Sequence, residues 1–253
     1  REEQQYMPRT SLKTVLLMAT PDPELIVSMG AKLCYSRADI EELQKTAKSA
    51  EFIDRLSQMG HLSPIEHASF SFGVEGVSRA LLAQITRHRL ASFSVQSQRY
   101  VNQGVKHGEF SYIIPPSIEA LGAAAVKKFE TQMATMQEWY DEWIKDLGNA
   151  GEASNEDARF VLPNACETKM IITMNARELL HFFELRCCNR AQWEIRELAW
   201  QMLALVMGCA PALFKNAGPA CVGGSCAEGK MCCKKAADVK KRHQKLMEDS
   251  INE

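Results

Sequence analysis

Residues 87–99 read Arg87-His88-Arg89-Leu90-Ala91-Ser92-Phe93-Ser94-Val95-Gln96-Ser97-Gln98-Arg99. The stretch lies inside a window, bounded by Glu75 and Glu109, that contains no acidic residue. The chain has 31 Asp and Glu in 253 residues, so a window of this length would hold about four by proportion. The cations that stand there without a local counter-charge are Arg79, Arg87, Arg89, Arg99 and Lys106. Guanidinium groups beside Ser and Gln donors match phosphate and carboxylate oxygens, so the window predicts an anion site.

A solvated basic face balanced by acids elsewhere is the competing interpretation of such a window. Its defined spacing favours a site: an Arg-His-Arg triplet is followed by Ser92, Ser97 and Arg99. Residues 78–86 predict a helix with Leu81, Leu82 and Ile85 on one side, so the triplet falls at a helix C-terminus, where cations are favourable. The Ser/Gln run that follows is expected to be extended or a loop that wraps a ligand.

Composition narrows the class of partner. With 46% hydrophobic residues the chain can bury a full core, and one domain of this length is ordinary. The net charge of −1 argues against duplex nucleic acid as the main partner, because backbone binding needs a broad positive surface. No apolar run is long enough to cross a bilayer and the N-terminus has no signal-peptide core, so we expect a cytoplasmic protein without membrane association.

Hydrophobic periodicity predicts a mixed α/β chain rich in helix. A linker-like turn is expected at 148–156, with Ser154 as the N-cap of a short helix that delivers Arg159. The tail is expected to end in a Lys-rich, exposed helix. Helices are expected at 38–60, 117–147, from 178 and at 191–207, and strands at 69–74 and 168–174.

The nine cysteines form two groups. Cys34, Cys166, Cys187, Cys188 and Cys209 lie in segments typical of the core, where free buried thiols are expected. Cys221, Cys226, Cys232 and Cys233 crowd a Gly-rich tail, and their spacing is not the paired C-x2-C of most zinc sites. A structural metal, a redox-labile cluster and no specific role all remain open for this second group.

Several motifs stand in a defined order along the chain. They are His61-x-Ser63-Pro64-x-Glu66-His67, Arg87-His88-Arg89 with Ser97 and Arg99, Arg159-x-Val161-Leu162-Pro163, Asn175-Ala176-Arg177, and Leu185-Arg186 followed by Ala191-Gln192-Trp193-Glu194-Ile195. This order resembles that of the flavin-dependent thymidylate synthases, and the resemblance covers roughly residues 20–215.

The resemblance implies a single mixed domain with a small, mainly antiparallel sheet flanked by helices, and a flavin-binding fold unlike the Rossmann type. No Gly-rich dinucleotide loop is present, in agreement with this. Residues 1–217 would form the catalytic domain and 218–253 a tail. The implied enzyme is a homotetramer with active sites where subunits meet. It makes dTMP from dUMP, with FAD as cofactor, NADPH as reductant and methylenetetrahydrofolate as carbon donor.

The same resemblance implies roles for individual residues. Arg186 would activate the uracil, because a guanidinium stabilises the negative charge that develops on the ring. The flavin set is Ser63, Arg87, His88, Arg89, Asn175, Arg177 and His181. The dUMP set is Gln84, Arg87, Ser97, Gln98, Arg99, Arg159 and Arg186.

Three of the residues in these motifs, Ser97, His61 and His67, could also suit other chemistry. Ser97 has no base next to it in the sequence, and the window holds no carboxylate that could orient one. We therefore expect Ser97 to bind substrate and not to act as a nucleophile. His61 and His67 flank Glu66 without a third convergent ligand, so no metal site is predicted. The pattern departs from the family at Val95, where relatives carry Glu or Gln, and at His181 and Arg190, where some carry Asn and His.

Two alternatives to the synthase remain. A non-enzymatic nucleotide- or RNA-binding module would use the basic loop 87–99 with Phe93 and Tyr100 as stacking surfaces, and would bind no chromophore. A flavoprotein reductase without methyl transfer would have no use for Arg159 and Arg186.

Overall fold

A computed structural model describes residues 9–47, 50–104 and 109–252. The chain divides into two compact units, each of which is built from separate stretches of sequence. Unit 1 takes the described residues of 1–13, 74–87 and 94–170, and unit 2 takes those of 14–73, 88–93 and 171–253. The predicted division between residues 217 and 218 stays a prediction, and the tail belongs to unit 2 by its contacts.

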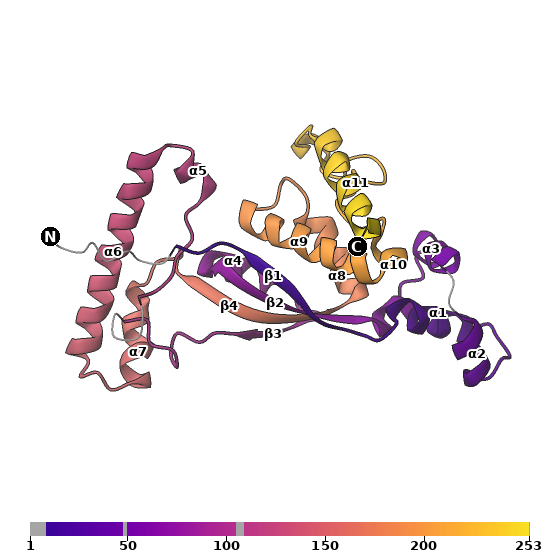
Figure 1. Ribbon diagram of the computed structural model, residues 1–253, viewed down its shortest axis with the longest axis horizontal. Coiled ribbons are helices and arrows are strands. Elements are labelled where there is room, and N and C mark those ends of the chain that lie inside the picture. Colours follow the sequence, from indigo (N-terminus) through magenta and orange to yellow (C-terminus); the bar gives the residue numbers. More distant parts are fainter. Residues whose placement is uncertain (1–8, 48–49, 105–108, 253) are drawn as a thin grey trace. The chain divides into compact units, whose positions relative to one another are not determined.

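A four-stranded sheet runs in the order β1 (Lys13–Ala19), β2 (Ser69–Ser78), β4 (Glu167–Asn175), β3 (Ala91–Val95) (Figure 1). Ala68 is hydrogen-bonded to Ala176 and Ser71 to Thr173, so the residue numbers of β4 fall as those of β2 rise. β2 and β4 are therefore antiparallel. Alternate residues of β2 and β4 are buried, as expected of strands with one covered face. Both strands predicted from sequence are confirmed, and β1 and β3 are additional.

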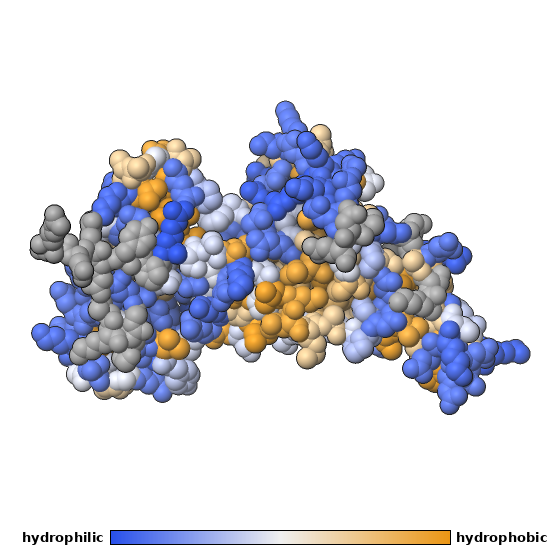
Figure 2. Space-filling model, viewed as in Figure 1, coloured by the Kyte–Doolittle hydropathy of each residue, from blue (hydrophilic) through white to orange (hydrophobic). Residues whose placement is uncertain are grey.

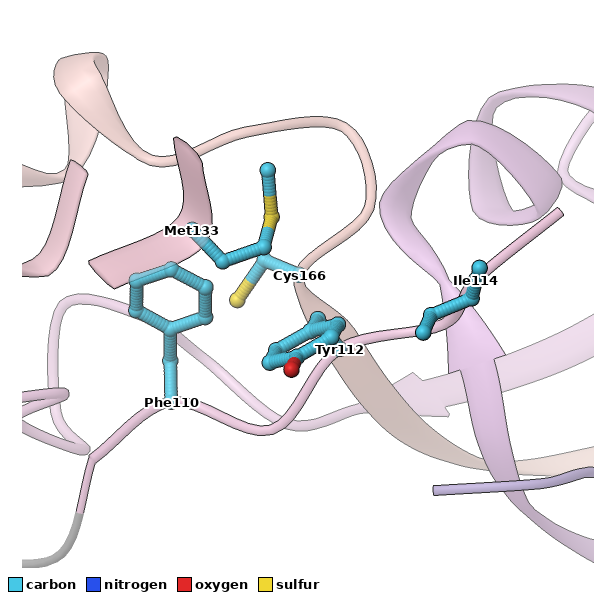
Figure 3. Packing of buried hydrophobic residues seen from close by; sticks show 5 residues of the cluster. All are labelled: Phe110, Tyr112, Ile114, Met133 and Cys166. Atoms are coloured by element: carbon cyan, nitrogen blue, oxygen red, sulfur yellow. The ribbon is translucent and has the colours of Figure 1, made fainter. Parts of the chain in front are cut away.

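The core of unit 1 gathers around Cys166 (Figure 3). The side chains of Phe110, Tyr112 and Met133 converge on it, and each of these residues is at most 3% exposed. Met133 comes from α6 (Ala123–Asp146), the longest helix of this unit among the described residues. The remaining helices of unit 1 are α4 (Arg79–Ile85), α5 (Pro116–Glu119), α7 (Glu152–Ala158) and the 3-10 turn η3 (Arg159–Val161).

The core of unit 2 is aromatic. The ring of Phe70 on β2 meets that of Phe214 edge-on at 5.4 Å, and Phe183 lies 6.0 Å from Phe214. The helices that supply this core and its cover are α1 (Pro23–Leu33), α2 (Ile40–Thr46), α3 (Ala50–Gln58), η1 (Pro64–His67), α8 (Ala176–Arg186), α9 (Trp193–Cys209), α10 (Pro211–Phe214), η4 (Gly229–Met231) and α11 (Ala236–Asn252).

Several predicted elements are corrected by the structure. The expected helix 117–147 is interrupted before α6 at Gly122, whose φ of 95° is a left-handed value that a regular helix does not accommodate. The expected helix 38–60 is divided into α2 and α3, and residues 48–49 lie outside the described part. Ser154 is not an N-cap: it is buried inside α7, where its hydroxyl donates to the Leu147 carbonyl.

The tail and the thiols also differ from expectation. α11 is not wholly exposed, because it packs against α9 and buries Val239 and His243. Cys34 and Cys209 are exposed, whereas the prediction of burial is confirmed for Cys166 and Cys187. Within the described ranges, every helix is too short or too polar to cross a bilayer.

Candidate active site

The start of α8 brings together several residues of the predicted flavin set. β4 ends at Asn175, whose side-chain oxygen accepts a hydrogen bond of 2.9 Å from the main-chain nitrogen of Glu178 and thereby caps the helix. Arg177, in the first turn, forms an ion pair with Glu66 of η1. Ser63, at the start of η1, is exposed and uses no side-chain hydrogen bond to cap that turn. These residues belong to unit 2, as does His181 one turn further along α8.

His88 is the buried member of the Arg-His-Arg triplet, with 6% of its surface exposed. Its Nδ1 lies 3.1 Å from Oε1 of Glu178, and its Nε2 accepts a hydrogen bond of 3.0 Å from Nε of Arg186. Its ring packs edge-on against Phe182, with centroids 5.0 Å apart. Burial lowers the pKa of His88, and the positive charge of Arg186 lowers it further, while the hydrogen bond and charge of Glu178 act in the opposite direction. The imidazole is therefore held neutral between a carboxylate and a guanidinium.

The two arginines of the triplet point away from the core. Arg87 and Arg89 are both exposed, and neither has an ion-pair partner among the residues that the structure describes. Arg87 ends its stretch of unit 1, whereas Arg89 lies in unit 2. Exposed guanidinium groups without a protein carboxylate are suited to an anionic ligand.

Arg99, which has no counter-charge in the local sequence, has two acidic partners in the structure. Its guanidinium is paired with Glu152, and its Nε lies 2.7 Å from Oε2 of Glu156. Both carboxylates come from α7, which follows much later in the chain, and the local sequence therefore gave no sign of them. Lys106, the last cation of the window, falls outside the described residues.

The loop that carries Ser97, Gln98 and Arg99 is fastened to unit 1 by Asn155. This buried amide donates to the carbonyl oxygen of Arg99 at 2.8 Å. Its oxygen accepts from the Asn102 side chain at 2.6 Å and from the Tyr140 hydroxyl at 3.4 Å. The Ser97 hydroxyl accepts from the main-chain nitrogen of Arg99, which tightens the same turn.

A second group of polar residues surrounds Cys166. The Gln98 amide donates to its sulfur at 3.4 Å. Burial raises the pKa of the Cys166 thiol to about 11, which excludes it as a nucleophile near neutral pH. The pKa of Arg79 is lowered by burial and also by the positive charge of Arg159, so these two cations lie within electrostatic reach of each other. Paired cations beside an amide form a second candidate anion site in unit 1.

The predicted residues thus divide between the units. Every member of the flavin set except Arg87 lies in unit 2, and every member of the dUMP set except Arg186 lies in unit 1. Gln84 lies on α4 and is half-buried. Val95, where the family pattern fails, is the half-buried last residue of β3.

Sequence reasoning missed five residues that the structure brings into these groups. They are Glu178, Glu152, Glu156, Asn155 and Arg79. Arg79 lay in the acid-free window but was assigned no role, and the spacing of Glu178 and Arg186 on one helix face was a usable signal. The other three could not be found locally, because their partners are distant in sequence.

The thiols of the tail belong to unit 2. Cys188, Cys221 and Cys226 line a small cavity beside Glu184 and Leu185. Among the described residues, no group of three His, Cys, Asp or Glu is arranged to hold a metal ion.

Comparisons with known proteins converge on one family. Residues 15–212 match the family model described as "Thymidylate synthase complementing protein". A flavin-dependent thymidylate synthase of Geobacter sulfurreducens is 49% identical over 238 residues, which cover 93% of this chain and 99% of that protein. One of Clostridium tetani is 49% identical over 244 residues, covering 91% and 96%.

Two solved structures share the fold. A UMP/dUMP methylase, PolB, from Streptomyces cacaoi bound with 5-Br dUMP has a TM-score of 0.66 at 23% identity, covering 83% of this chain and 95% of that one. ThyX of Helicobacter pylori complexed with FAD and dUMP has a TM-score of 0.60 at 24% identity, covering 81% and 99%. At these identities the likeness concerns the fold, and it agrees with the predicted mixed α/β architecture.

Proposed function

The chain belongs to the flavin-dependent thymidylate synthases, and from this premise we propose that it makes dTMP from dUMP. In this proposal the flavin set binds the cofactor and the dUMP set binds the nucleotide. Methylenetetrahydrofolate would supply the carbon and NADPH the reducing equivalents. The redox chemistry between NADPH and the nucleotide would be supplied by bound FAD. The protein's own residues bind and orient the ligands and stabilise charge.

The residues of unit 2 fit a flavin dinucleotide by their donor chemistry. Arg89 supplies positive charge, Arg177 supplies a second guanidinium that is now paired with Glu66, and the side chains of Asn175 and Ser63 supply neutral donors. A pyrophosphate is bound well by such a set, since guanidinium groups match phosphate oxygens. His88 and His181 complete the proposed contacts of unit 2, and Arg87 is the one member of the flavin set that belongs to unit 1.

The dUMP set of unit 1 has the charge and hydrogen-bonding groups of a uridylate site. Arg99 and Arg159 would bind the phosphate, with Ser97, Gln98 and Gln84 as neutral partners. A phosphate at Arg99 would compete with Glu152 and Glu156, which at present neutralise it. Arg79, whose pKa is lowered by the positive charge of Arg159, is an additional candidate for binding the phosphate.

Arg186 would stabilise negative charge on the uracil as its C5 becomes nucleophilic. A guanidinium carries five N–H donors in a rigid fork, and the one on Nε is directed at His88. This contact carries the proposal. Arg186 follows His88 by 98 residues, yet it is hydrogen-bonded to the signature triplet. A binding module built on loop 87–99 alone would have no use for it.

The test starts with colour. A yellow protein with flavin absorbance removes the binding-module alternative. Purified, flavin-loaded protein is then assayed for dTMP from dUMP with methylenetetrahydrofolate and NADPH, and absence of product refutes the proposal. Arg186→Ala should keep its flavin and lose most turnover, while Arg37→Ala, an exposed arginine of the same unit, should match the wild type.

We further propose a homotetramer with active sites at subunit interfaces. Figure 2 shows apolar side chains gathered over the strands on the face in view. Exposed apolar residues on the strands of unit 2 include Val15, Leu17, Met18 and Ile171. Exposed apolar surface of this kind typically marks an interaction site. Light scattering coupled to size exclusion should give four chains per particle.

We further propose that residues 1–217 form the catalytic domain. We place the enzyme in the cytoplasm, since its nine free cysteines fit a reducing compartment.

A further inference from the structure

Three side chains of unit 2 form a hydrogen-bonded series: Glu178, His88 and Arg186. The two contacts measure 3.1 Å and 3.0 Å, and both Glu178 and His88 are only 6% exposed. Glu178, Phe182 and Arg186 are spaced by four residues on α8, so they occupy one stripe of the helix. The ring of His88 lies along this stripe and touches three successive turns.

The donors and acceptors of this series fix the tautomer of His88. Nε of Arg186 can only donate, so Nε2 of His88 must offer a lone pair. In a neutral imidazole the proton then lies on Nδ1, where it is donated to the carboxylate of Glu178. The opposite tautomer would set two N–H groups against each other at Nε2.

We propose that Glu178 is a positioning residue for Arg186 and acts through His88. The carboxylate holds the ring in one tautomer and one plane, and the ring's Nε2 holds the guanidinium that activates the uracil. This role rests on the proposed function of Arg186. Glu178 itself lies behind the ring and takes no part in binding substrate.

The series also predicts a dependence on pH. The charged and titratable groups that face His88 are Glu178, Arg186 and His181, all on α8. Protonation of His88 would turn Nε2 into a donor and break its bond with Arg186, so activity should fall on the acid side. Glu178 is the neighbour that raises the pKa of His88, whereas burial and Arg186 lower it. Neutralising Glu178 should therefore move the acid limb to lower pH.

The experiment compares the wild type with Glu178→Ala, Glu178→Gln and a control, Glu184→Gln, which changes an exposed glutamate of the same helix. Nitrogen-15 NMR of histidine-labelled protein, with His88→Gln for assignment, reports the tautomer without turnover. We expect Nδ1–H in the wild type and a mixed tautomer in Glu178→Ala. Flavin content should stay unchanged in the Glu178 and Glu184 variants.

Kinetics supply the second readout. Glu178→Ala should lower kcat about ten-fold or more with little change in KM, since loss of the carboxylate leaves the imidazole in a mixture of tautomers, one of which cannot accept from Arg186. Glu178→Gln, whose amide oxygen can still accept from Nδ1, should recover most of kcat and show its acid limb at lower pH. A purely structural role would not move that limb.

Three results overturn the inference. They are an unchanged tautomer in Glu178→Ala, a kcat within about two-fold of wild type in that variant, or an acid limb of Glu178→Gln that is unmoved or moves to higher pH. Should Glu178→Ala fail to fold, the isosteric Glu178→Gln decides through its pH profile and NMR signals. If the wild type makes no dTMP, the proposed function fails and the positioning role fails with it. If the wild type makes dTMP and the variants behave as it does, only the positioning role fails.

Discussion

Asn155→Ala should loosen the loop that carries Ser97, Gln98 and Arg99. The Asn155 side chain is 3% exposed and joins this loop to α7 through the bond to the Arg99 carbonyl. Alanine removes that bond and both bonds to the amide oxygen. It also leaves the Arg99 carbonyl and the Asn102 amide, both of half-buried residues, without these partners.

The magnitude follows from these three contacts. A hydrogen bond contributes about 1 kcal/mol net, and a buried group left unpaired costs about 1–3 kcal/mol. The bond of 3.4 Å from Tyr140 is long and adds little. We therefore expect a loss of about 2–3 kcal/mol in the free energy of unfolding, or about 5–10 °C in Tm for a chain of this length.

Urea unfolding followed by fluorescence, at one fixed protein concentration, measures this loss. Tyr140→Phe, which removes one hydroxyl and keeps Asn155, should cost about 1 kcal/mol. Thr131→Ala on the exposed face of α6 is the control and should stay within about 0.5 kcal/mol. The KM for dUMP should rise in Asn155→Ala while flavin content is retained. A loss no larger than that of the Thr131→Ala control, with an unchanged KM, would refute the reasoning.

Three further predictions concern backbone, thiols and pH. Gly76→Ala should cost about 3–5 kcal/mol in urea unfolding, because Gly76 has a φ of 71° and an added Cβ would lie 1.9 Å from the Ser11 carbonyl oxygen. Cys233 should be the first thiol to react with Ellman's reagent, because two N–H donors to its sulfur lower its pKa. Cys187 should be the last, because burial raises its pKa, and peptide mapping of the labelled protein gives the order. Stability should fall as pH drops below about 6.5, because burial lowers the pKa of His243 in the folded chain while the unfolded chain still takes up the proton. His243→Gln should lose less stability than the wild type between pH 7.5 and 5.5.

Controls separate these effects from general damage. Gly122→Ala meets no atom within 4 Å and so tests the backbone strain of a positive φ alone, at about 1–3 kcal/mol. An equal loss at both glycines would show that the clash at Gly76 is absent. Labelling of Cys187 before Cys233, or a steeper acid loss in His243→Gln, would contradict the other two predictions.

Local elements were predictable because their determinants are local. Ser78 and Asn175 end strands and cap the helices that follow them, and both have the side-chain oxygen that a cap needs. The alternation from Ser69 to Val74 and from Thr168 to Met174 marked β2 and β4 correctly. Ser154 failed as a cap because α7 begins before it, at Glu152, and its hydroxyl instead donates to the Leu147 carbonyl and accepts from the Ala150 main-chain nitrogen in the preceding turn.

Electrostatic surroundings were less predictable than the residues themselves. The acid-free window correctly indicated Arg87 and Arg89 as cations without a protein partner among the described residues. It gave no sign of the partners of Arg99, whose carboxylates come from α7, outside the window. The separation of two charged residues in the sequence says little about whether they form an ion pair, because folding can bring residues that are far apart in the sequence into contact.

By itself the sequence determined several of the helices, the two central strands and the order of motifs that places the chain in its family. These properties follow from periodicity, capping chemistry and spacing, all of which act over a few residues or can be compared in order. Only the tertiary structure decided that Arg186 contacts Nε2 of His88 and that Glu178 contacts Nδ1 on the other side of the same ring. It also decided that Arg99 is paired. Such contacts join residues that are far apart in sequence, and they exist only once packing has fixed the path of the chain between them.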